Sequence, residues 1–359
     1  MWPDDQAEAT GHPSAPSYPP LPAPRFDHLR RLTTRAGLFE HARFDVPRVE
    51  HGYCTDDNAR ALVVVSRQAE ASGGLADLAA TYLGFVLEAR TNGGAFHNRR
   101  APDGAWSDDV GSDDSQGRAW WGLGTAARSA PTEWMRQAGA DAFSTCTTFD
   151  SQHLRANAYA ALGAAEMLIA DPGHPAARDL LSRTSGVIAD AASSSIPWPE
   201  ARITYDNARI PDALMAAGRS LGNTRLSNVG LRLLEWLVDA ESSGRHFSFA
   251  PTDGWSIGQP RPGFDQQPIE AWAMADACHR AWRMTGDPIW RTRVLRSARW
   301  LLGVNDAGLA LYDPDTGATY DGLEAASVNE NCGAESTLAG IAALQDAASC
   351  QPRSDEDTV

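Results

Sequence analysis

The chain has 359 residues, of which 43% are hydrophobic, so it can bury a large core as one big domain or two smaller ones. Its 31 basic and 46 acidic residues give a net charge of −15, which argues against a nucleic-acid partner and an anionic membrane surface. The five cysteines are scattered and lack CxxC spacing, which indicates neither a disulfide framework nor a zinc site and fits a reducing compartment.

The two ends of the chain differ from the rest in composition. Residues 1–24 are rich in proline and lack the basic start and apolar core of a signal peptide, so we expect a disordered leader. Residues 349–359 are expected to form a disordered tail. No stretch is long and apolar enough to span a membrane. We therefore expect a cytoplasmic protein with a single catalytic domain at residues 25–348.

The segment between these ends is predicted to be mostly helical. Residues 25–43 can form a first helix, and Asp103-Gly104 marks a hairpin between short mixed runs. Apolar periodicity and breaks at Gly and Pro predict further helices, which alternate as partners along the chain. They are expected at about 57–70, 75–90, from about 114, at 131–146, 154–168 and 175–192, from a start within 204–214, and at 226–241, 269–283, 287–303 and 335–348.

Several of these helices begin with the same polar pattern, in which an acid is followed by an amide, an arginine and then an apolar helical rhythm. Three copies are full, and three looser ones begin at Phe149, Phe264 and Gly333. The full copies are TDDNARAL (Thr55–Leu62), DDSQGRAWWGL (Asp113–Leu123) and TYDNARIPDAL (Thr204–Leu214). A helix N-terminus favours carboxylates, because its N–H groups are exposed and its dipole is positive there.

Paired helices at a spacing of about fifty residues indicate an α-helical repeat architecture. Six similar helix starts favour a closed ring over an open solenoid, because a ring points the same end of all inner helices at one cavity. We therefore predict an all-α fold, an (α/α)6 toroid with short β-hairpin connections at the cavity end. The helix near Arg25 would be the outer partner of the last inner helix.

Such a cavity would gather carboxylates, as glycosidic bond hydrolysis requires. One carboxyl group must be protonated to donate to the leaving oxygen, and another must be ionised. The catalytic candidates are Asp206 and Asp114, followed by Asp57 and Asp265, with Glu335 and Glu200 in reserve. Amides, arginines and tryptophans suit sugar hydroxyls and sugar faces. The substrate-binding candidates are Asp56, Asn58, Arg60, Gln116, Arg118, Trp198, Glu200, Asn207, Arg209, Trp255, Gln266, Gln267, Asn329, Asn331 and Glu335, and Trp106 is a further stacking candidate.

Each of these residues also has a structural interpretation. An acid at a helix start is most often a cap. Arg60, Arg118 and Arg209 can instead pair with acids of neighbouring repeats and hold the ring together. The histidines nearest the expected cavity end are His51, His97 and His153, which fit either acid/base groups or structural roles. No HxH or HExxH spacing occurs, so neither a metal site nor a cofactor is predicted.

The segments HGYCTDDNARAL, SDDSQGRAWWGLG, TYDNARIPDAL, GFDQQPIEA and VNENCGAEST extend over about residues 51–344. In these segments the chain resembles a group of bacterial proteins in the six-hairpin glycosidase superfamily, described only as conserved or as partners or C-terminal regions of glycosyltransferases. The resemblance implies an (α/α)6 toroid and a carbohydrate substrate. The group often has an aromatic residue where this chain has Pro199, which leaves the orientation of Glu200 open.

Relatives in that superfamily include inverting glycosidases, unsaturated glucuronyl hydrolases, phosphorylases and epimerases, so the fold alone does not select a reaction. The leading hypothesis is a glycoside hydrolase that cleaves an oligosaccharide or polysaccharide fragment with inversion. The first alternative is a sugar epimerase or isomerase of the same fold. The second is a non-catalytic glycan-binding partner of a glycosyltransferase.

Overall fold

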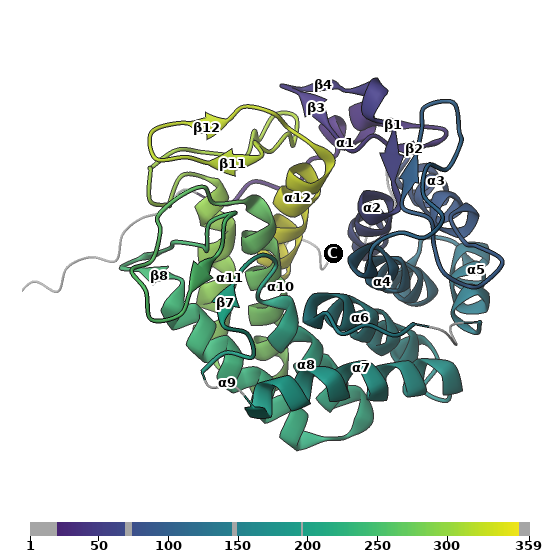
Figure 1. Ribbon diagram of the computed structural model, residues 1–359. Coiled ribbons are helices and arrows are strands. Elements are labelled where there is room, and N and C mark those ends of the chain that lie inside the picture. Colours follow the sequence, from purple (N-terminus) through teal and green to yellow (C-terminus); the bar gives the residue numbers. More distant parts are fainter. Residues whose placement is uncertain (1–19, 69–73, 146–148, 195–196, 352–359) are drawn as a thin grey trace, which may run out of the picture.

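The computed structural model describes residues 20–68, 74–145, 149–194 and 197–351. Most of the expected leader and most of the expected tail therefore lie outside the described residues. Figure 1 shows the helices arranged around a centre. The helices are α1 (Asp27–Leu32), α2 (Thr55–Arg67), α3 (Leu75–Glu88), α4 (Asp113–Ser129), α5 (Glu133–Phe143), α6 (Leu154–Ala170), α7 (Pro175–Ser194), α8 (Arg209–Leu221), α9 (Thr224–Ala240), α10 (Pro268–Thr285), α11 (Pro288–Leu301) and α12 (Ala334–Ser349).

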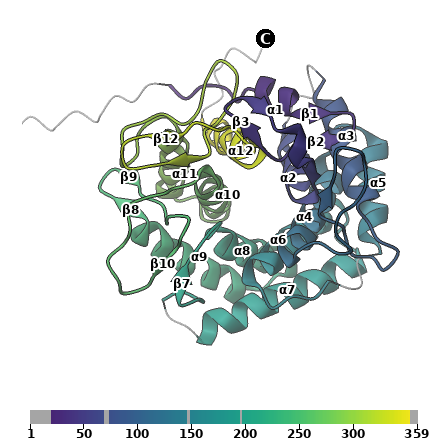
Figure 2. The same ribbon diagram turned by 45° about the horizontal axis from the view of Figure 1, so that its top comes forward.

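The even-numbered helices from α2 to α12 form an inner ring, and α3, α5, α7, α9 and α11 lie outside it (Figures 1 and 2). Each inner helix contacts the next one around the ring, and α12 contacts α2, so the ring is closed. Each odd-numbered helix from α3 to α11 packs against the inner helix that precedes it in sequence. The predicted toroid of helix pairs is confirmed, with the short α1 packed against α12.

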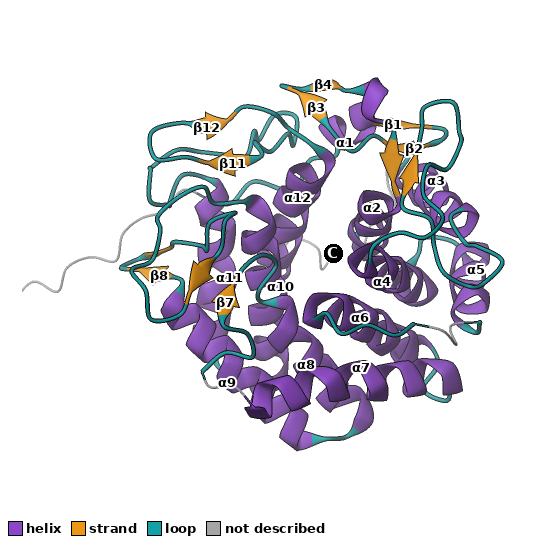
Figure 3. Cartoon of the chain, viewed as in Figure 1, coloured by secondary structure: helices purple, strands orange, loops and turns teal. Residues whose placement is uncertain are grey.

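The strands lie in the long connections that lead from an outer helix to the next inner helix, as the orange arrows in Figure 3 show. All of them pair in antiparallel twos: β1 (Thr33–Thr34) with β2 (Gly37–Leu38), β3 (Ala42–Arg43) with β4 (Val46–Pro47), β5 (Tyr53–Cys54) with β6 (Arg99–Arg100), β7 (Arg202–Ile203) with β10 (Trp255–Ser256), β8 (Ser242–Ser243) with β9 (His246–Phe247), and β11 (Gly322–Leu323) with β12 (Val328–Asn329). The connections thus place loops and hairpins at the N-terminal ends of the inner helices.

The inner helices approach one another closely where glycines face each other. A Cβ atom added to Gly124 on α4 would lie 2.0 Å from the carbonyl oxygen of Gly163 on α6. A Cβ atom on Gly163 would in turn lie 2.2 Å from the carbonyl oxygen of Trp120. Only residues without a side chain permit this approach, so the small residues in the α4 and α6 sequences serve the packing of the ring.

The first predicted helix is wrong in extent. Residues 25–43 are helical only over Asp27–Leu32, and the chain then forms the β1–β2 hairpin. Two successive β-branched residues, Thr33 and Thr34, favour strand over helix. Gly37 has φ 140° and lies so close to Phe85 that an added Cβ atom would clash at 2.6 Å. Among the described residues, no helix is long and apolar enough to cross a membrane.

Candidate functional site

The acids of the repeated pattern lie in or before the first turn of the inner helices, and other residues cap those helices. Cys54 caps α2 through its sulfur, and the hydroxyl of Ser112 caps α4. Asp206 precedes α8 and has φ 49°, so it is outside that helix altogether. The interpretation of these acids as caps is therefore wrong, and their carboxylates are free for other partners.

Those partners are mainly the arginines of the same pattern, which join neighbouring inner helices. Arg60 on α2 donates to Glu335 of α12 at 2.6 Å, and Arg118 on α4 donates to both oxygens of Asp56 on α2, at 2.8 and 2.9 Å. Arg209 on α8 donates to Asp276 on α10. The structure therefore confirms that these arginines pair with acids of neighbouring repeats.

A tyrosine extends this network around the ring. The hydroxyl of Tyr159 on α6 accepts a hydrogen bond from Arg118 at 2.7 Å and donates one to Asp206 at 2.6 Å. Asp206 also accepts from Arg209 Nε at 3.1 Å. Contacts of this kind link α12 to α2, α2 to α4, and α4 through α6 to α8 and α10.

The acids in this network differ in their access to solvent. Asp57 and Asp206 are buried; Asp57 pairs with Arg60 at 2.5 Å, and Asp206 with Arg209. By contrast, the side chains of Asp56, Asp114 and Glu335 are 21%, 17% and 36% exposed. These three acids come from the starts of α2, α4 and α12, which are consecutive around the ring. We call them the mouth carboxylates.

Arginines lie among the mouth carboxylates, and the pKa values of two of these carboxyl groups are shifted in opposite directions. Arg118 Nη1 lies 2.8 Å from one oxygen of Asp56 and 3.9 Å from one of Asp114. Burial opposes ionisation of Asp56, but Arg118 and Arg60 outweigh it and hold the pKa of that carboxyl below its ordinary value. Burial raises the pKa of Glu335, with Arg60 opposing the rise and Asp57 adding to it. Neighbouring carboxyl groups with pKa values moved in opposite directions can act as base and acid.

Asp114 has a partner of its own at the mouth. The hydroxyl of Tyr205 donates to its carboxylate at 2.5 Å. The Tyr205 ring lies against the guanidinium of Arg155, 4.7 Å from ring centre to Cζ. Arg155 in turn donates to both oxygens of Glu200, at 2.9 and 2.8 Å, and to Asn207. Asp114 is therefore held from the loop before α8, across the ring.

A pocket of about 490 Å³ opens beside this group, between the start of α6 and the loop before α8. Its lining includes His153, Arg155, Glu200 and Tyr205. Because Arg155 fixes both oxygens of Glu200, the carboxylate is oriented even though it follows Pro199. Sequence reasoning missed Arg155, although it ends an acid, amide and arginine series in the copy that begins at Phe149.

The amide in three of these helix starts has a structural use that sequence reasoning did not anticipate. Asn58 accepts from Leu38 N at 3.0 Å and donates to Cys54 O, and Gln116 exchanges hydrogen bonds with both backbone groups of Phe96. Gln266 accepts from Phe249 N at 3.0 Å. These buried amides hold the connecting hairpins onto the inner helices, so the structure does not offer them to sugar hydroxyls.

The turn that contains Asp206 and Asn207 rests on a buried acid. Glu270 on α10 accepts hydrogen bonds from the backbone N–H groups of both residues, and from the Asn207 side chain at 3.1 Å. Burial and the charge of Asp206 raise the pKa of Glu270 to about 7. The protonation state of Glu270 therefore affects the hydrogen bonds that hold the left-handed turn at Asp206.

We expect the stability of the protein to fall as the pH rises through about 7, in part because of Glu270. The folded protein keeps this proton up to about pH 7, whereas an unfolded glutamate releases it near 4.5. The contribution is therefore full below the unfolded pKa and is lost as the pH rises through the folded one. Urea unfolding at about pH 5 and about pH 8 should show a smaller decrease in Glu270→Gln than in the wild type. An equal decrease would contradict this assignment.

The predicted aromatic platforms differ in their access. Trp198 is 1% exposed and stacks on Trp236 with ring centres 5.6 Å apart, so the structure leaves it no free face for a sugar. Trp255 is half-buried in β10, and its ring N–H donates to Gln259 O. Trp106 is half-buried against His97, with ring centres 5.2 Å apart. The prediction that Trp198 stacks on substrate is therefore wrong.

The other predicted residues lie away from the mouth carboxylates. Asp265 is exposed before α10, and burial together with Glu324 and Asp253 raises its pKa. Gln267 immediately precedes α10 and makes no side-chain cap bond to it. His51 and His153 are exposed, and His97 bonds to Asp108 O. Within the described parts of the chain, none of these histidines contacts a mouth carboxylate.

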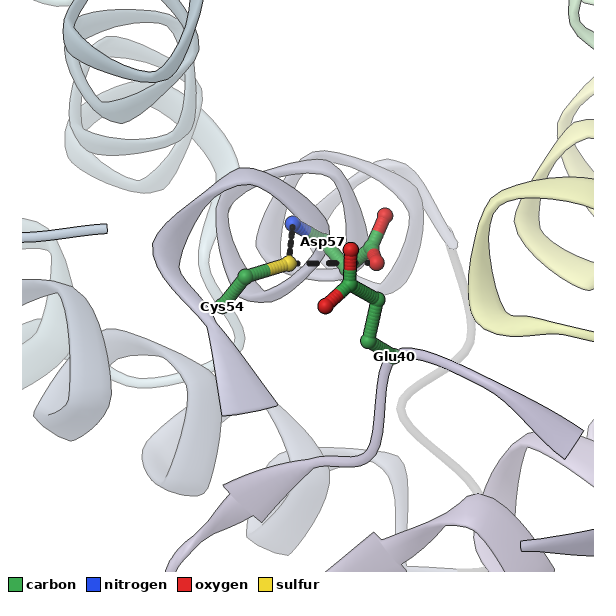
Figure 4. A group of neighbouring side chains, drawn as sticks. All are labelled: Glu40, Cys54 and Asp57. Carbon is green, nitrogen blue, oxygen red and sulfur yellow. Dashed lines mark hydrogen bonds between the residues drawn. The ribbon is translucent and has the colours of Figure 1, made fainter. Parts of the chain in front are cut away.

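Cys54 and two acids form a tight group under the mouth, shown in Figure 4. The Cys54 thiol donates to Asp57 Oδ2 at 3.2 Å, and Glu40 brings a second carboxylate to within 4.8 Å of both. Burial and the adjacent Asp57 raise the pKa of the thiol well above its ordinary value. Asp57 is paired with Arg60, and Glu40 with Arg99, so guanidinium groups already balance this group.

No family model matches the sequence, and no curated protein shows significant similarity to it. Solved structures do share its fold. A sugar epimerase from a ruminal bacterium is 12% identical with a TM-score of 0.66, over 90% of this chain and 95% of that one. A cellobiose 2-epimerase from Spirochaeta thermophila is 11% identical with a TM-score of 0.64, over 90% and 92%.

Glycoside hydrolases have the same fold. An inactive variant of an α-1,6-mannanase from Salegentibacter sp. HEL1_6, in complex with α-1,6-mannotriose, is 10% identical with a TM-score of 0.59, over 90% of this chain and 97% of that one. Identities this low show a shared (α/α)6 toroid and do not show a shared reaction. The chain therefore has the fold of six-hairpin epimerases and glycoside hydrolases.

Proposed function

We propose that the protein is a carbohydrate-active enzyme that hydrolyses a glycosidic bond with its mouth carboxylates. The observation that carries this proposal is the meeting of Asp56, Asp114 and Glu335 at one end of a closed ring, each partly open to solvent. The carbohydrate ligands and activities of proteins with the same fold support it.

In this proposal Glu335 is the general acid, because its pKa is raised, and Asp114 is the second catalytic carboxylate. Asp56 stays ionised beside Arg118 and stabilises positive charge that develops on the sugar. The distances to Arg118 separate Asp56 and Asp114 by at most about 7 Å, so both carboxylates lie close enough to act on one sugar unit.

Asp206 and Asp57, both candidates from the sequence, are assigned a supporting role in this proposal. Each is buried and bonded to an arginine of its own helix start, which leaves no room beside it for a sugar oxygen. The inactive mannanase has two consecutive aspartates replaced by asparagine. This chain has consecutive pairs at Asp56-Asp57 and Asp113-Asp114, which supports a catalytic place for the starts of α2 and α4.

A sugar epimerase or isomerase is the second candidate, because three solved epimerases and a D-mannose isomerase share this fold. An epimerase that uses His51, His97 or His153 as proton carriers would need these histidines near the mouth carboxylates. Their positions away from the mouth carboxylates favour hydrolysis. A role as glycan-binding partner of a glycosyltransferase would use the same mouth without conversion.

The test is a screen of the purified protein against a broad panel of oligosaccharides with mass-resolved detection of products, run beside Glu335→Gln. Shorter products that disappear in the variant support a hydrolase with Glu335 in its site. A product of unchanged mass and new retention time would overturn hydrolysis in favour of epimerisation. Saturable binding without conversion would favour the glycan-binding role.

A further inference from the structure

A second hollow lies between the β3–β4 hairpin and the β11–β12 hairpin. It has a volume of about 650 Å³. Apolar groups form one part of its lining and polar side chains the other. Its lining includes Phe44, Leu309, Val328, Asn329, Glu330 and Asn331. Figure 2 shows both hairpins next to α12.

Phe44 projects into this hollow from a backbone conformation that phenylalanine rarely adopts. It has φ 53° and is the first of the two residues that join the Arg43–Val46 pair of the hairpin. Glycine is usual at that position, and a left-handed conformation costs other residues about 1–2 kcal/mol. Strain of this kind persists where surrounding structure enforces it, and it is often associated with function.

The segment before α12 enforces the conformation of Phe44 from both sides. The Phe44 N–H donates to Asn331 Oδ1 at 3.0 Å, and the Cys332 N–H donates to the Phe44 carbonyl at 2.9 Å. Although clamped in this way, the Phe44 residue remains 51% exposed. The hydrogen bonds therefore hold an aromatic side chain partly in solvent at a fixed place.

The hollow and the proposed catalytic mouth are linked by a short stretch of chain. Asn331 precedes the general acid Glu335 by four residues, a span of at most about 14 Å of chain. The Ala334 N–H donates to Glu40 O at 3.0 Å, which ties the start of α12 to the β2–β3 connection. A chain of sugar units bound at the mouth can therefore reach Phe44.

We propose that this hollow is a distal carbohydrate subsite in which Phe44 stacks on the face of a sugar ring. The inference rests on the proposed function and adds a place for substrate units beyond the bond that is cleaved. An aromatic ring offers an apolar face, and a few polar groups fix the orientation of a bound ligand. Among the described residues, the Asn329 amide nitrogen and the Glu330 carboxylate make no hydrogen bonds, so both can bond to sugar hydroxyls.

The test compares Phe44→Asn with Phe44→Trp and the control Val46→Thr. Asparagine tolerates the left-handed conformation, so the first variant keeps the turn and loses the ring. Val46 is on the same hairpin, is 60% exposed and does not line the hollow. For long oligosaccharides found by the screen, kcat/KM should fall about tenfold in Phe44→Asn. It should stay unchanged for the shortest one cleaved, and Phe44→Trp and Val46→Thr should keep wild-type values.

Several results would overturn the subsite. If Phe44→Asn loses the same factor on every chain length, or nothing on any, Phe44 holds no distal sugar, while the proposed hydrolysis stands. A change of sedimentation coefficient in Phe44→Asn, with unchanged kinetics, would assign the hollow to a second copy of the chain. If the wild type neither converts nor binds any oligosaccharide in calorimetry, the subsite and the proposed function fail together.

Discussion

Asp114→Asn is expected to lower kcat/KM by at least about 1000-fold on any substrate that the wild type cleaves, since it removes the ionised carboxylate from the proposed mechanism. The change conserves shape, and asparagine can still accept the hydrogen bond that Tyr205 donates at 2.5 Å. The loss should therefore appear in turnover and not in folding. Steady-state kinetics beside thermal unfolding would measure both.

The matched control is Asp113→Asn, in the preceding position of the same helix start. Its carboxylate is 46% exposed and accepts from Ser151 at 2.6 Å, so it turns toward α6 and away from Arg118. We expect this variant to keep wild-type kinetics within a few-fold. Wild-type turnover in Asp114→Asn would refute the assignment of Asp114 as a catalytic residue. A large loss in Asp113→Asn alone would assign the catalytic carboxylate to Asp113 instead.

Arg209→Met is expected to lower the free energy of unfolding by about 3–5 kcal/mol, because it takes one cationic partner from each of two buried carboxylates. Arg209 is fully buried, bonds to Asp206 and Asp276, and contacts the rings of both Trp121 and Trp272, at 4.6 and 4.7 Å from their centres. Urea unfolding of the variant and the wild type would measure the difference.

The control for this change is Arg25→Gln, which removes an exposed pair with Asp27 and should cost less than about 1 kcal/mol. A second variant tests the reason for the loss. Adding Asp206→Asn to Arg209→Met removes one of the two carboxylate charges, so it should recover part of the stability. If Arg209→Met unfolds no more easily than Arg25→Gln, the buried ion pairs do not hold the ring together.

The fold could be predicted from the sequence because its signals are local and repeat. Apolar periodicity gave the helices to within a few residues at most ends, and six similar polar starts favoured a ring over a solenoid. The clearest exception is residues 25–43, where Gly37 lies against Phe85 in the β1–β2 hairpin. That contact joins residues far apart in sequence, so periodicity alone could not reveal it.

The candidate site, like the fold, could be predicted from the sequence only in part. The sequence by itself determined which residue types gather at the helix starts, since acid, amide and arginine recur there in a fixed order. Only the tertiary structure decided which acids are buried in ion pairs and which remain open, because their partners lie on other helices. Tyr205 meets Asp114 across 91 positions, and Glu270 meets the Asp206 N–H across 64. The order of residues along one helix carries no information on such pairs, whereas closure of the ring brings them together and sets the charge of the mouth.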